Sequence, residues 1–336
     1  MTSSRRSSLE LAKGETSHVR FTIWGVGAVG IGIASTLARA GERLRLLGRD
    51  PDTCDALAEH GIRRTGLFGE RHVPPDLLSI TTDPTSLRDD PPEWLLVCTK
   101  AFAAATIARE LAPLAASLKS ETRLLLCQNG WGNEEPFRPF WPDERLFHAR
   151  VITGFHRRSA HEVEITAHAS PIALGSVFGH EIHSLESVAA QITAGGVPAE
   201  TTPDMRGVLW GKMLYNCALN PLGALAGRRY GELAKDRTTR ALVDEVIREI
   251  FQVLEAAGIP VAWPTAEAYL EVFHSELIPA TAAHESSMLQ DLRAGRPTEI
   301  EALCGAVERL GIGLNVQTPV VSALATLVRA AEREPS

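Results

Sequence analysis

Apolar runs and helical repeats alternate along the first part of the chain. Four mainly apolar segments typical of strands cover residues 19–24, 44–48, 94–99 and 123–128. Helical spacing of apolar residues separates them, over residues 28–40 and 101–115. Strands that alternate with helices predict a parallel sheet with helices on its faces. The chain is then strand-like from 146 to 177, with a short helix at 182–193, so we expect an α/β domain over residues 19–202.

The rest of the chain has the apolar periodicity of helices. Helices are predicted at residues 204–224, 237–257, 265–273, 299–310 and 319–333. Gly258 and Gly311 follow two of these runs, where a helix C-terminal cap belongs. We therefore expect an all-helical domain over residues 203–336. Residues 1–18 are polar and lack an apolar segment, so they are predicted to be a disordered extension.

A glycine-rich turn follows the first predicted strand, with the sequence Gly25-Val26-Gly27-Ala28-Val29-Gly30. Gly25 would make a tight turn, Gly27 would let the backbone approach a pyrophosphate, and Gly30 would let helix pack on strand. Backbone N–H groups of Ala28 and Val29, at the positive end of the helix, would hold the phosphates. A second strand follows at the spacing of a βαβ unit. The pattern therefore predicts a Rossmann-type dinucleotide site rather than a purely structural turn.

Arg49 ends the second predicted strand, 19 residues after Gly30. An acidic residue here would hydrogen-bond the ribose 2′-hydroxyl of NAD, whereas an arginine can pair with the 2′-phosphate of NADP. The pattern favours NADPH/NADP as the cofactor. The alternatives are that Asp50, which follows at once, selects NAD, or that Arg49 is an ordinary surface charge.

Two further polar residues follow apolar strands. Lys100 ends the run at 94–99, and Asn129 follows the run at 123–128. Ligands of open α/β sheets bind outside the carboxyl ends of the strands. Both side chains are therefore predicted to lie in the same crevice as the glycine turn, where they would take part in the cofactor site.

The helix predicted over residues 208–222 carries a polar stripe on an otherwise apolar segment. Lys212, Asn216 and Asn220 recur at every fourth position, so they lie on one side of the helix. Asn is a poor helix former, and Lys is rarely buried without a partner. The stripe therefore indicates groups aimed at a ligand, and a narrow solvent-facing stripe is the alternative.

A carboxylate stands near the end of the segment Ser286-Ser287-Met288-Leu289-Gln290-Asp291-Leu292-Arg293-Ala294-Gly295-Arg296-Pro297-Thr298-Glu299-Ile300-Glu301. Glu299 lies where a Pro-Thr turn would open an amphipathic helix. By itself, such a residue is most simply a carboxylate that complements the helix dipole.

These motifs together resemble the ketopantoate reductases (2-dehydropantoate 2-reductases), which reduce ketopantoate to pantoate with NADPH on the route to pantothenate. The resemblance covers residues 19 to 333, and the segment that ends in Glu299 is its most specific part. It implies an N-terminal Rossmann domain and a helical C-terminal domain, with the substrate bound between them. It also implies that Lys212 is the general acid and that Glu299 orients both Lys212 and the substrate.

The resemblance implies further roles around this pair. The substrate would contact Asn216, Asn220 and Ser287. Asn129 and Lys100 would lie near the nicotinamide, and Arg49 would bind the 2′-phosphate. The chemistry suits these residue types, because hydride delivery to a ketone leaves charge on oxygen that an ammonium can stabilise and protonate.

Three positions depart from the family pattern. Tyr230 and His284 stand where family members commonly carry asparagines, and Ala167-His168-Ala169-Ser170 replaces a glycine-bearing turn. The predicted cofactor and acid groups match the family, whereas these positions at the substrate rim differ. The predicted substrate is therefore ketopantoate or a closely related 2-oxo acid.

Composition narrows the classes of function. A net charge of -7 argues against a general nucleic-acid binder. No apolar run reaches the ~18 residues of a membrane span. The five cysteines are far apart, which favours buried free thiols in a reducing cytoplasm over disulfides or a metal site.

We interpret the chain as a cytoplasmic NADPH-dependent oxidoreductase with a small 2-oxo acid as its substrate. One alternative is another two-domain NAD(P)-dependent hydroxy acid dehydrogenase. The other is a catalytically silent NADP-binding regulator, which would not need Lys212 and Glu299 together. The sequence leaves open whether the chain forms a homodimer.

Overall fold

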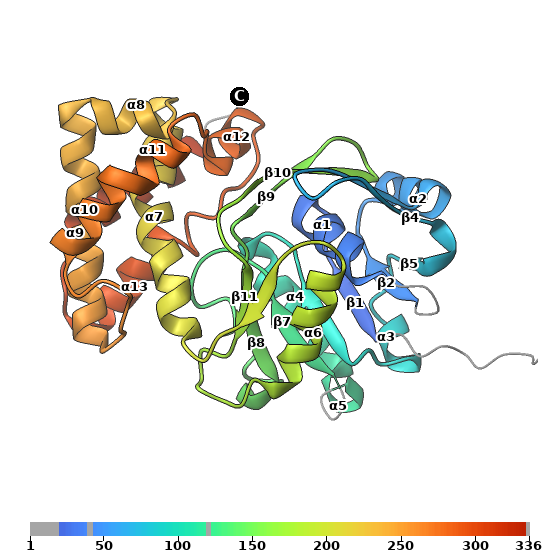
Figure 1. Cartoon of the computed structure of the whole chain (residues 1–336). Coiled ribbons are helices and arrows are strands. Elements are labelled where there is room, and N and C mark those ends of the chain that lie inside the picture. The colour runs from blue at the N-terminus through green and yellow to red at the C-terminus, as the bar shows by residue number, and fades with distance from the viewer. Residues whose placement is uncertain (1–19, 39–42, 119–121, 334–336) are drawn as a thin grey trace, which may run out of the picture.

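The computed structural model describes residues 20–38, 43–118 and 122–333, and it shows two parts side by side (Figure 1). One part contains a large sheet with helices on its faces, and the other is a group of packed helices. The predicted fold class, a Rossmann-type sheet followed by a helical region, is confirmed. The predicted extension at residues 1–18 lies outside the described residues.

The large sheet has eight strands in the order β12-β11-β8-β7-β6-β1-β2-β5. Their bounds are β1 (Phe21–Trp24), β2 (Leu44–Leu47), β5 (Leu78–Thr81), β6 (Trp94–Val97), β7 (Arg123–Leu126), β8 (Leu146–Arg150), β11 (Ile172–Gly175) and β12 (Ala199–Thr201). Six neighbouring strands, β8, β7, β6, β1, β2 and β5, are parallel. Strand β11 runs antiparallel to β8. The carboxyl ends of β1, β6, β7 and β8 therefore meet at one edge.

The mainly apolar segments arise because the central strands are buried on both faces. In β6, Trp94 and Leu96 contribute to the core on one face, whereas Leu95 and Val97 contribute to the core on the other. The helices of this part are α1 (Ala28–Leu37), α2 (Pro51–His60), α3 (Ser86–Asp89), α4 (Ala104–Leu111), α5 (Ala115–Leu118) and α6 (His183–Ala194). Apolar residues of α1 and α6 cover the first face, and those of α4 cover the second.

The helix predicted over residues 101–115 is broken into short pieces. A 3-10 turn that contains Pro113 separates α4 from α5. By length and composition alone, Ala101–Leu118 is apolar enough to cross a membrane, although no apolar run of that length was predicted from the sequence. Core helices have the same composition, and Ile107, Leu111 and Leu118 are buried against the sheet.

A second sheet, which the sequence patterns did not predict, lies over α1. Its order is β4-β3-β10-β9, and its bounds are β3 (Ile62–Gly66), β4 (Arg71–Val73), β9 (Thr153–Arg157) and β10 (Glu162–His168). The prediction of strands over residues 146–177 is therefore confirmed, but these strands belong to two different sheets. Phe155 of β9 packs so tightly on α1 that a Cβ at Gly32 would collide with its ring.

The helical part is built around α7 (Met205–Ala226). The other helices are α8 (Tyr230–Lys235), α9 (Arg237–Ala257), α10 (Ala266–Val272), α11 (Ile278–Thr281), α12 (Ser287–Arg293), α13 (Cys304–Leu314) and α14 (Pro319–Ala331). Helices α9, α12 and α14 all pack on α7. Trp210, Leu214 and Cys217 of α7 are fully buried in this core, as expected from a helix that is apolar on several sides.

Three predicted helix ends can be compared with the structure. Gly258 caps α9 in the left-handed conformation, as predicted, with φ +61°. The prediction that Gly311 is a cap was wrong, since Gly311 lies within α13 and Asn315 takes the left-handed cap position. The prediction that a helix opens at Glu299 was also wrong, because α13 begins at Cys304.

Candidate active site

The glycine turn has the geometry that a dinucleotide site needs. Gly25 has φ +107°, a conformation that L side chains rarely adopt. A Cβ at Gly30 would collide with the carbonyl oxygen of Gly25, so this glycine allows α1 to pack on the turn. A Cβ at Gly27 would meet nothing within 4 Å. The first amides of α1, including those of Ala28 and Val29, have no acceptor within the helix, and no side chain caps them at Gly27.

Arg49 lies just beyond β2, with 55% of its side chain exposed. Its guanidinium forms an ion pair with Glu110 of α4 at 2.5 Å. The neighbouring Asp50 caps α2, where its carboxylate accepts hydrogen bonds from the amide and hydroxyl of Thr53. The hydrogen bond from the Thr53 hydroxyl is the main reason that the pKa of Asp50 lies below its ordinary value. The carboxylate that could have selected NAD is thus engaged within its own helix.

Lys212 lies on the side of α7 that faces the sheet. Its Nζ donates to Oδ1 of Asn129 at 2.5 Å and to the carbonyl oxygen of Val151 at 2.6 Å. Asn129 follows β7, and Val151 follows β8. The ammonium therefore contacts the carboxyl edge of the sheet, at which the glycine turn follows β1.

The surroundings of Lys212 make it a weaker base than a free lysine. Burial, the largest cause, lowers the pKa of Lys212 to about 8. The negative charge of Glu299 raises this pKa, and the positive charge of Arg150 lowers it. A lysine with this pKa is still mostly protonated at neutral pH, and it releases its proton more readily than an exposed lysine does.

Glu299 is joined to Lys212 through an amide. Asn129 donates from Nδ2 to Oε2 of Glu299 at 3.0 Å, while its Oδ1 accepts from Lys212. The other carboxylate oxygen accepts from the backbone N–H of Ala101 at 3.2 Å. Glu299 is buried in a turn before α13, so it does not serve as a helix-dipole carboxylate. Asn129, which was expected in the cofactor site, connects the two predicted catalytic residues.

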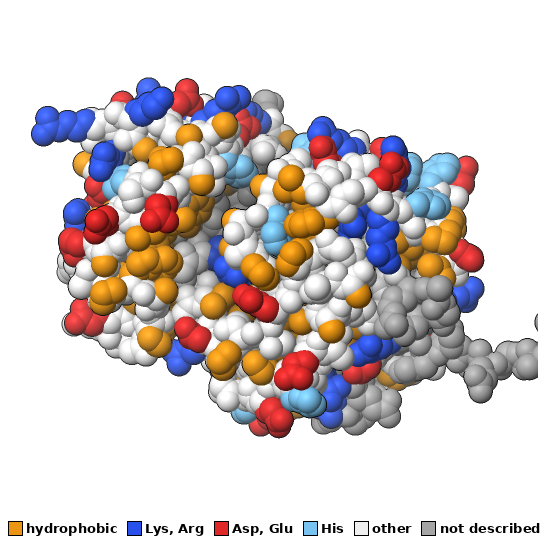
Figure 2. Space-filling view, viewed as in Figure 1, with side chains coloured by type: hydrophobic (Ala, Val, Ile, Leu, Met, Phe, Trp, Pro, Cys, Tyr) orange, Lys and Arg blue, Asp and Glu red, His pale blue; other side chains and the backbone are white. Residues whose placement is uncertain are grey.

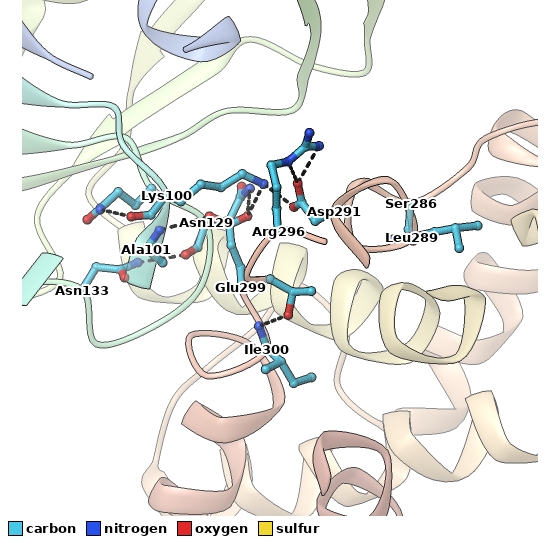
Figure 3. Close-up of polar contacts among 12 residues, drawn as sticks. Lys100, Ala101, Asn129, Asn133, Ser286, Leu289, Asp291, Arg296, Glu299 and Ile300 are labelled. Carbon is cyan, nitrogen blue, oxygen red and sulfur yellow. Dashed lines mark hydrogen bonds and ion pairs between the residues drawn. The ribbon is translucent and has the colours of Figure 1, made fainter. Parts of the chain in front are cut away.

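Lys100 links the sheet to the helical part (Figure 3). Its Nζ donates to Oδ2 of Asp291 at 2.8 Å and lies 3.8 Å from Oε2 of Glu299. Asp291 also accepts from Nε of Arg296 at 3.0 Å. Asp291 and Arg296 were not identified as site residues from the sequence, although both lie in its most specific segment.

A cavity opens beside Lys212 where α7 meets the ends of β7 and β8. It is lined by Gln128, Asn129, Gly130, Ala149, Arg150, Leu209, Lys212, Met213 and Asn216. On the molecular surface, a hollow with Lys or Arg side chains near its base separates the helical part from the sheet part (Figure 2). Asn216 is thus brought together with Lys212, as predicted from their spacing. Arg150 was missed, although it too is a polar residue that closes an apolar strand.

The structure does not bring two predicted substrate residues to this cavity wall. Asn220 is buried, and its Oδ1 accepts a hydrogen bond of 2.5 Å from the hydroxyl of Tyr230. Ser287 is exposed at the first turn of α12. Its neighbour Ser286 is the buried cap of that helix, with Oγ accepting from the amide of Leu289.

Two of the three departures from the family pattern lie together in space. Tyr230 and His284 pack against each other with ring centroids 5.0 Å apart. Tyr215 meets Tyr230 edge to face at 5.7 Å. His168 lies at the end of β10, where its Nδ1 is 3.0 Å from Oγ1 of Thr153. The first two departures thus form one aromatic group next to Asn220.

Over the part of the chain that the structure describes, there is no group of three or more His, Cys, Asp or Glu side chains that could hold a metal ion. The five cysteines (Cys54, Cys98, Cys127, Cys217 and Cys304) are all described, and they are buried and free, as predicted.

Comparison with known proteins agrees with this architecture. Residues 21–179 match the sequence model described as ketopantoate reductase PanE/ApbA, and residues 204–332 match its C-terminal counterpart. A 2-dehydropantoate 2-reductase of Aquifex aeolicus is 33% identical over 94% of this chain and 97% of its own length. One of Halobacterium salinarum is 29% identical over 94% of this chain and its full length.

Solved structures give the same result. A 2-dehydropantoate 2-reductase from Geobacter metallireducens superimposes with a TM-score of 0.82 and 28% identity, and it covers 93% of this chain and 100% of that one. A PanE/ApbA family ketopantoate reductase from Ralstonia eutropha gives 0.80 and 27%, over 93% and 98% of the two chains. The chain therefore belongs to the ketopantoate reductase family of nicotinamide-dependent oxidoreductases.

Proposed function

We propose that this protein uses NADPH to reduce ketopantoate, or a closely related 2-oxo acid, to the 2-hydroxy acid. The observation that carries the proposal is the contact of Lys212 with Asn129 and Val151 at the carboxyl edge of the sheet. This arrangement holds an ammonium beside a cavity on the edge where a Rossmann sheet binds its dinucleotide. The family membership of the chain supports the same reaction type.

The residues present fit a nicotinamide dinucleotide. The open space before Gly27 would admit a pyrophosphate, and the free amides of Ala28 and Val29 would hold it. Arg49 would bind the 2′-phosphate by releasing Glu110, since its guanidinium is half exposed. The engagement of Asp50 in its helix cap supports NADPH over NADH. When bound, NADPH supplies the hydride for the ketone carbon.

Lys212 supplies the proton in this mechanism. Negative charge grows on the ketone oxygen as the carbon is reduced, and an ammonium beside that oxygen stabilises the charge and then protonates it. The lowered pKa of Lys212, about 8, suits this role, because the group is protonated at neutral pH and yields its proton without great cost.

Asn129 and Glu299 prepare Lys212 for this step. The Asn129 amide can accept from Lys212 only through Oδ1, and its Nδ2 donates to Glu299. Glu299 thereby fixes the orientation of the amide and favours the charged form of Lys212. We propose that both residues act through Lys212, and that Lys100 holds Glu299 and Asp291 in place.

Substrate binding is proposed to begin at Asn216, which lines the cavity beside Lys212. Asn220 and Ser287 remain proposed contacts from the family resemblance. The Oδ1 of Asn220 is already occupied by Tyr230, so Asn220 would offer the substrate only its Nδ2 donors. Tyr230 and His284 stand where the family commonly has asparagines, which is why the proposal includes 2-oxo acids closely related to ketopantoate.

The proposal is tested by following NADPH oxidation with a panel of 2-oxo acids. Ketopantoate is compared with 2-oxoisovalerate, 2-oxobutyrate and phenylglyoxylate, each with NADPH and with NADH. We expect turnover with at least one of these acids and a higher kcat/KM with NADPH. Tight NADPH binding without turnover of any of them would favour a silent NADP-binding regulator. Turnover only of 3-oxo acids would favour another hydroxy acid dehydrogenase.

A further inference from the structure

Arg150 is a second cation on the wall of the cavity that contains Lys212. It is the last residue of β8, directly before Val151, whose carbonyl oxygen accepts from Lys212. The lining of the cavity includes Arg150 together with Lys212 and Asn216. The two positive charges interact, since the charge of Arg150 lowers the pKa of Lys212.

Among the described residues, no carboxylate forms an ion pair with the guanidinium of Arg150. Its guanidinium donates a hydrogen bond of 3.1 Å from Nη2 to the carbonyl oxygen of Pro171. Its Nε is buried without an acceptor. Glu200 acts on it from a distance but forms no ion pair with it in the described part of the chain. Burial of a guanidinium without a carboxylate is unfavourable, and such groups concentrate at functional sites.

We propose that Arg150 binds the carboxylate of the 2-oxo acid, next to the ketone that Lys212 protonates. In a 2-oxo acid the carboxylate carbon is bonded to the ketone carbon, so two cations on one cavity wall match the two adjacent oxygen-bearing groups. A guanidinium presents paired N–H donors that match a carboxylate in geometry. This inference rests on the proposed function, and it adds a reason why acids rather than neutral ketones are the substrates.

Binding of an acid also prepares Lys212 for its role. An unpaired Arg150 disfavours the ammonium form of Lys212, and a carboxylate that pairs with Arg150 removes this repulsion. The pKa of Lys212 is therefore higher when an acid is paired with Arg150 than in the empty cavity. A neutral ketone in the same cavity would lack this effect.

The inference is tested with Arg150→Gln and Arg150→Lys. Each variant is compared on a reducible 2-oxo acid and on the methyl ester of the same acid, which is a neutral ketone of nearly the same shape. For Arg150→Gln we expect kcat/KM to fall about 10- to 100-fold for the acid, mainly through KM. The ester should change little. Arg150→Lys should recover part of the loss, since it keeps the charge but not the paired donors.

Two further measurements separate binding from a structural role. With NADP⁺ present, titration calorimetry should show that oxamate, an inert analogue of a 2-oxo acid, binds the wild-type protein at least tenfold more tightly than it binds Arg150→Gln. The pH at which kcat/KM falls should rise in Arg150→Gln, because Lys212 loses a repelling neighbour. The matched control is Arg123→Gln, which removes an arginine from the start of β7 and should leave all values unchanged.

Equal losses for the acid and the ester would overturn the inference, because Arg150 would then only support the Pro171 turn. Equal oxamate affinity in the wild type and in Arg150→Gln, or no binding to either, would also overturn it. The proposed function fails in a different way, if oxamate binds through Arg150 but NADPH reduces none of the 2-oxo acids. If Arg150→Gln has a lower Tm, the comparison is made with Arg150→Lys, which keeps the positive charge and a hydrogen-bond donor at this position.

Discussion

Replacement of Glu299 by glutamine should lower the pH at which the enzyme loses activity. Glu299→Gln keeps an amide oxygen as an acceptor for Asn129 but removes the negative charge. The two hydrogen bonds of the Asn129 amide measure 2.5 and 3.0 Å. The amide itself spans about 2.3 Å, so the charges of Lys212 and Glu299 are at most roughly 8 Å apart.

That separation sets the size of the effect. Two unit charges about 7 Å apart interact by ~0.6–2.4 kcal/mol when the effective dielectric constant is between ~80 and ~20. The protonated form of Lys212 is the active form, and its pKa is about 8. Without Glu299, the pKa of Lys212 falls, and the alkaline loss of kcat should begin about 0.4–1.7 pH units lower.

The assay is kcat for NADPH oxidation between pH 6 and 10 at saturating 2-oxo acid. Glu299→Gln should be close to the wild type at the acidic end and well below it at the alkaline end. The losses in a Lys212→Ala, Glu299→Gln double variant should not multiply, because Glu299 acts through Lys212. An unchanged alkaline limb, together with multiplicative losses, would refute this role of Glu299.

Three further predictions concern the cofactor site and the sheet. Arg49→Ala should weaken NADPH binding by about 1.5–3 kcal/mol in titrations and leave NADH almost unaffected; equal weakening of both would remove Arg49 from the 2′-phosphate site. Gly30→Ala should lower Tm and abolish NADPH binding, since its Cβ would meet the Gly25 carbonyl, and a variant that binds NADPH normally would contradict the tight packing. Glu134→Gln should lower the free energy of unfolding at pH 7 by about 1.5–3 kcal/mol, because Glu134 is buried 3.1 Å from His148. Burial raises the pKa of Glu134, but the contact with His148 outweighs it and leaves this pKa below its ordinary value, so denaturation curves of wild type and variant should converge as pH falls below about 4; a difference that persists there would contradict the account.

The elements that the sequence predicts well are those whose residue pattern is determined by their own local burial or backbone conformation. The strands at 94–97 and 123–126 are buried on both faces, so all their residues except Arg123 are apolar. Helix α9 was predicted with its observed bounds because its amphipathic repeat ends at a glycine cap. The glycine turn was recognisable because Gly25 and Gly30 each meet a separate steric demand, while Gly27 leaves open space.

The elements that were missed depend on contacts between distant residues. The second sheet pairs β3 with β10, which lie far apart in the chain, and β3 alternates buried and exposed residues over only five positions. Asn129 was predicted to lie in the crevice because ligands bind outside the carboxyl ends of the strands. Its position between Lys212 and Glu299, however, depends on how the helical part packs on the sheet. The same rule would have identified Arg150, had it been applied to β8.

The most direct test of the account is the rate of NADPH oxidation by Lys212→Ala on the best 2-oxo acid. The variant removes the proton donor and the positive charge beside the ketone oxygen, while the glycine turn and Arg49 remain to bind NADPH. We predict that kcat falls ~100- to 10,000-fold and that the Kd for NADPH stays within a few fold of the wild-type value. A kcat near that of the wild type would contradict the account, because Lys212 would then take no part in the chemistry.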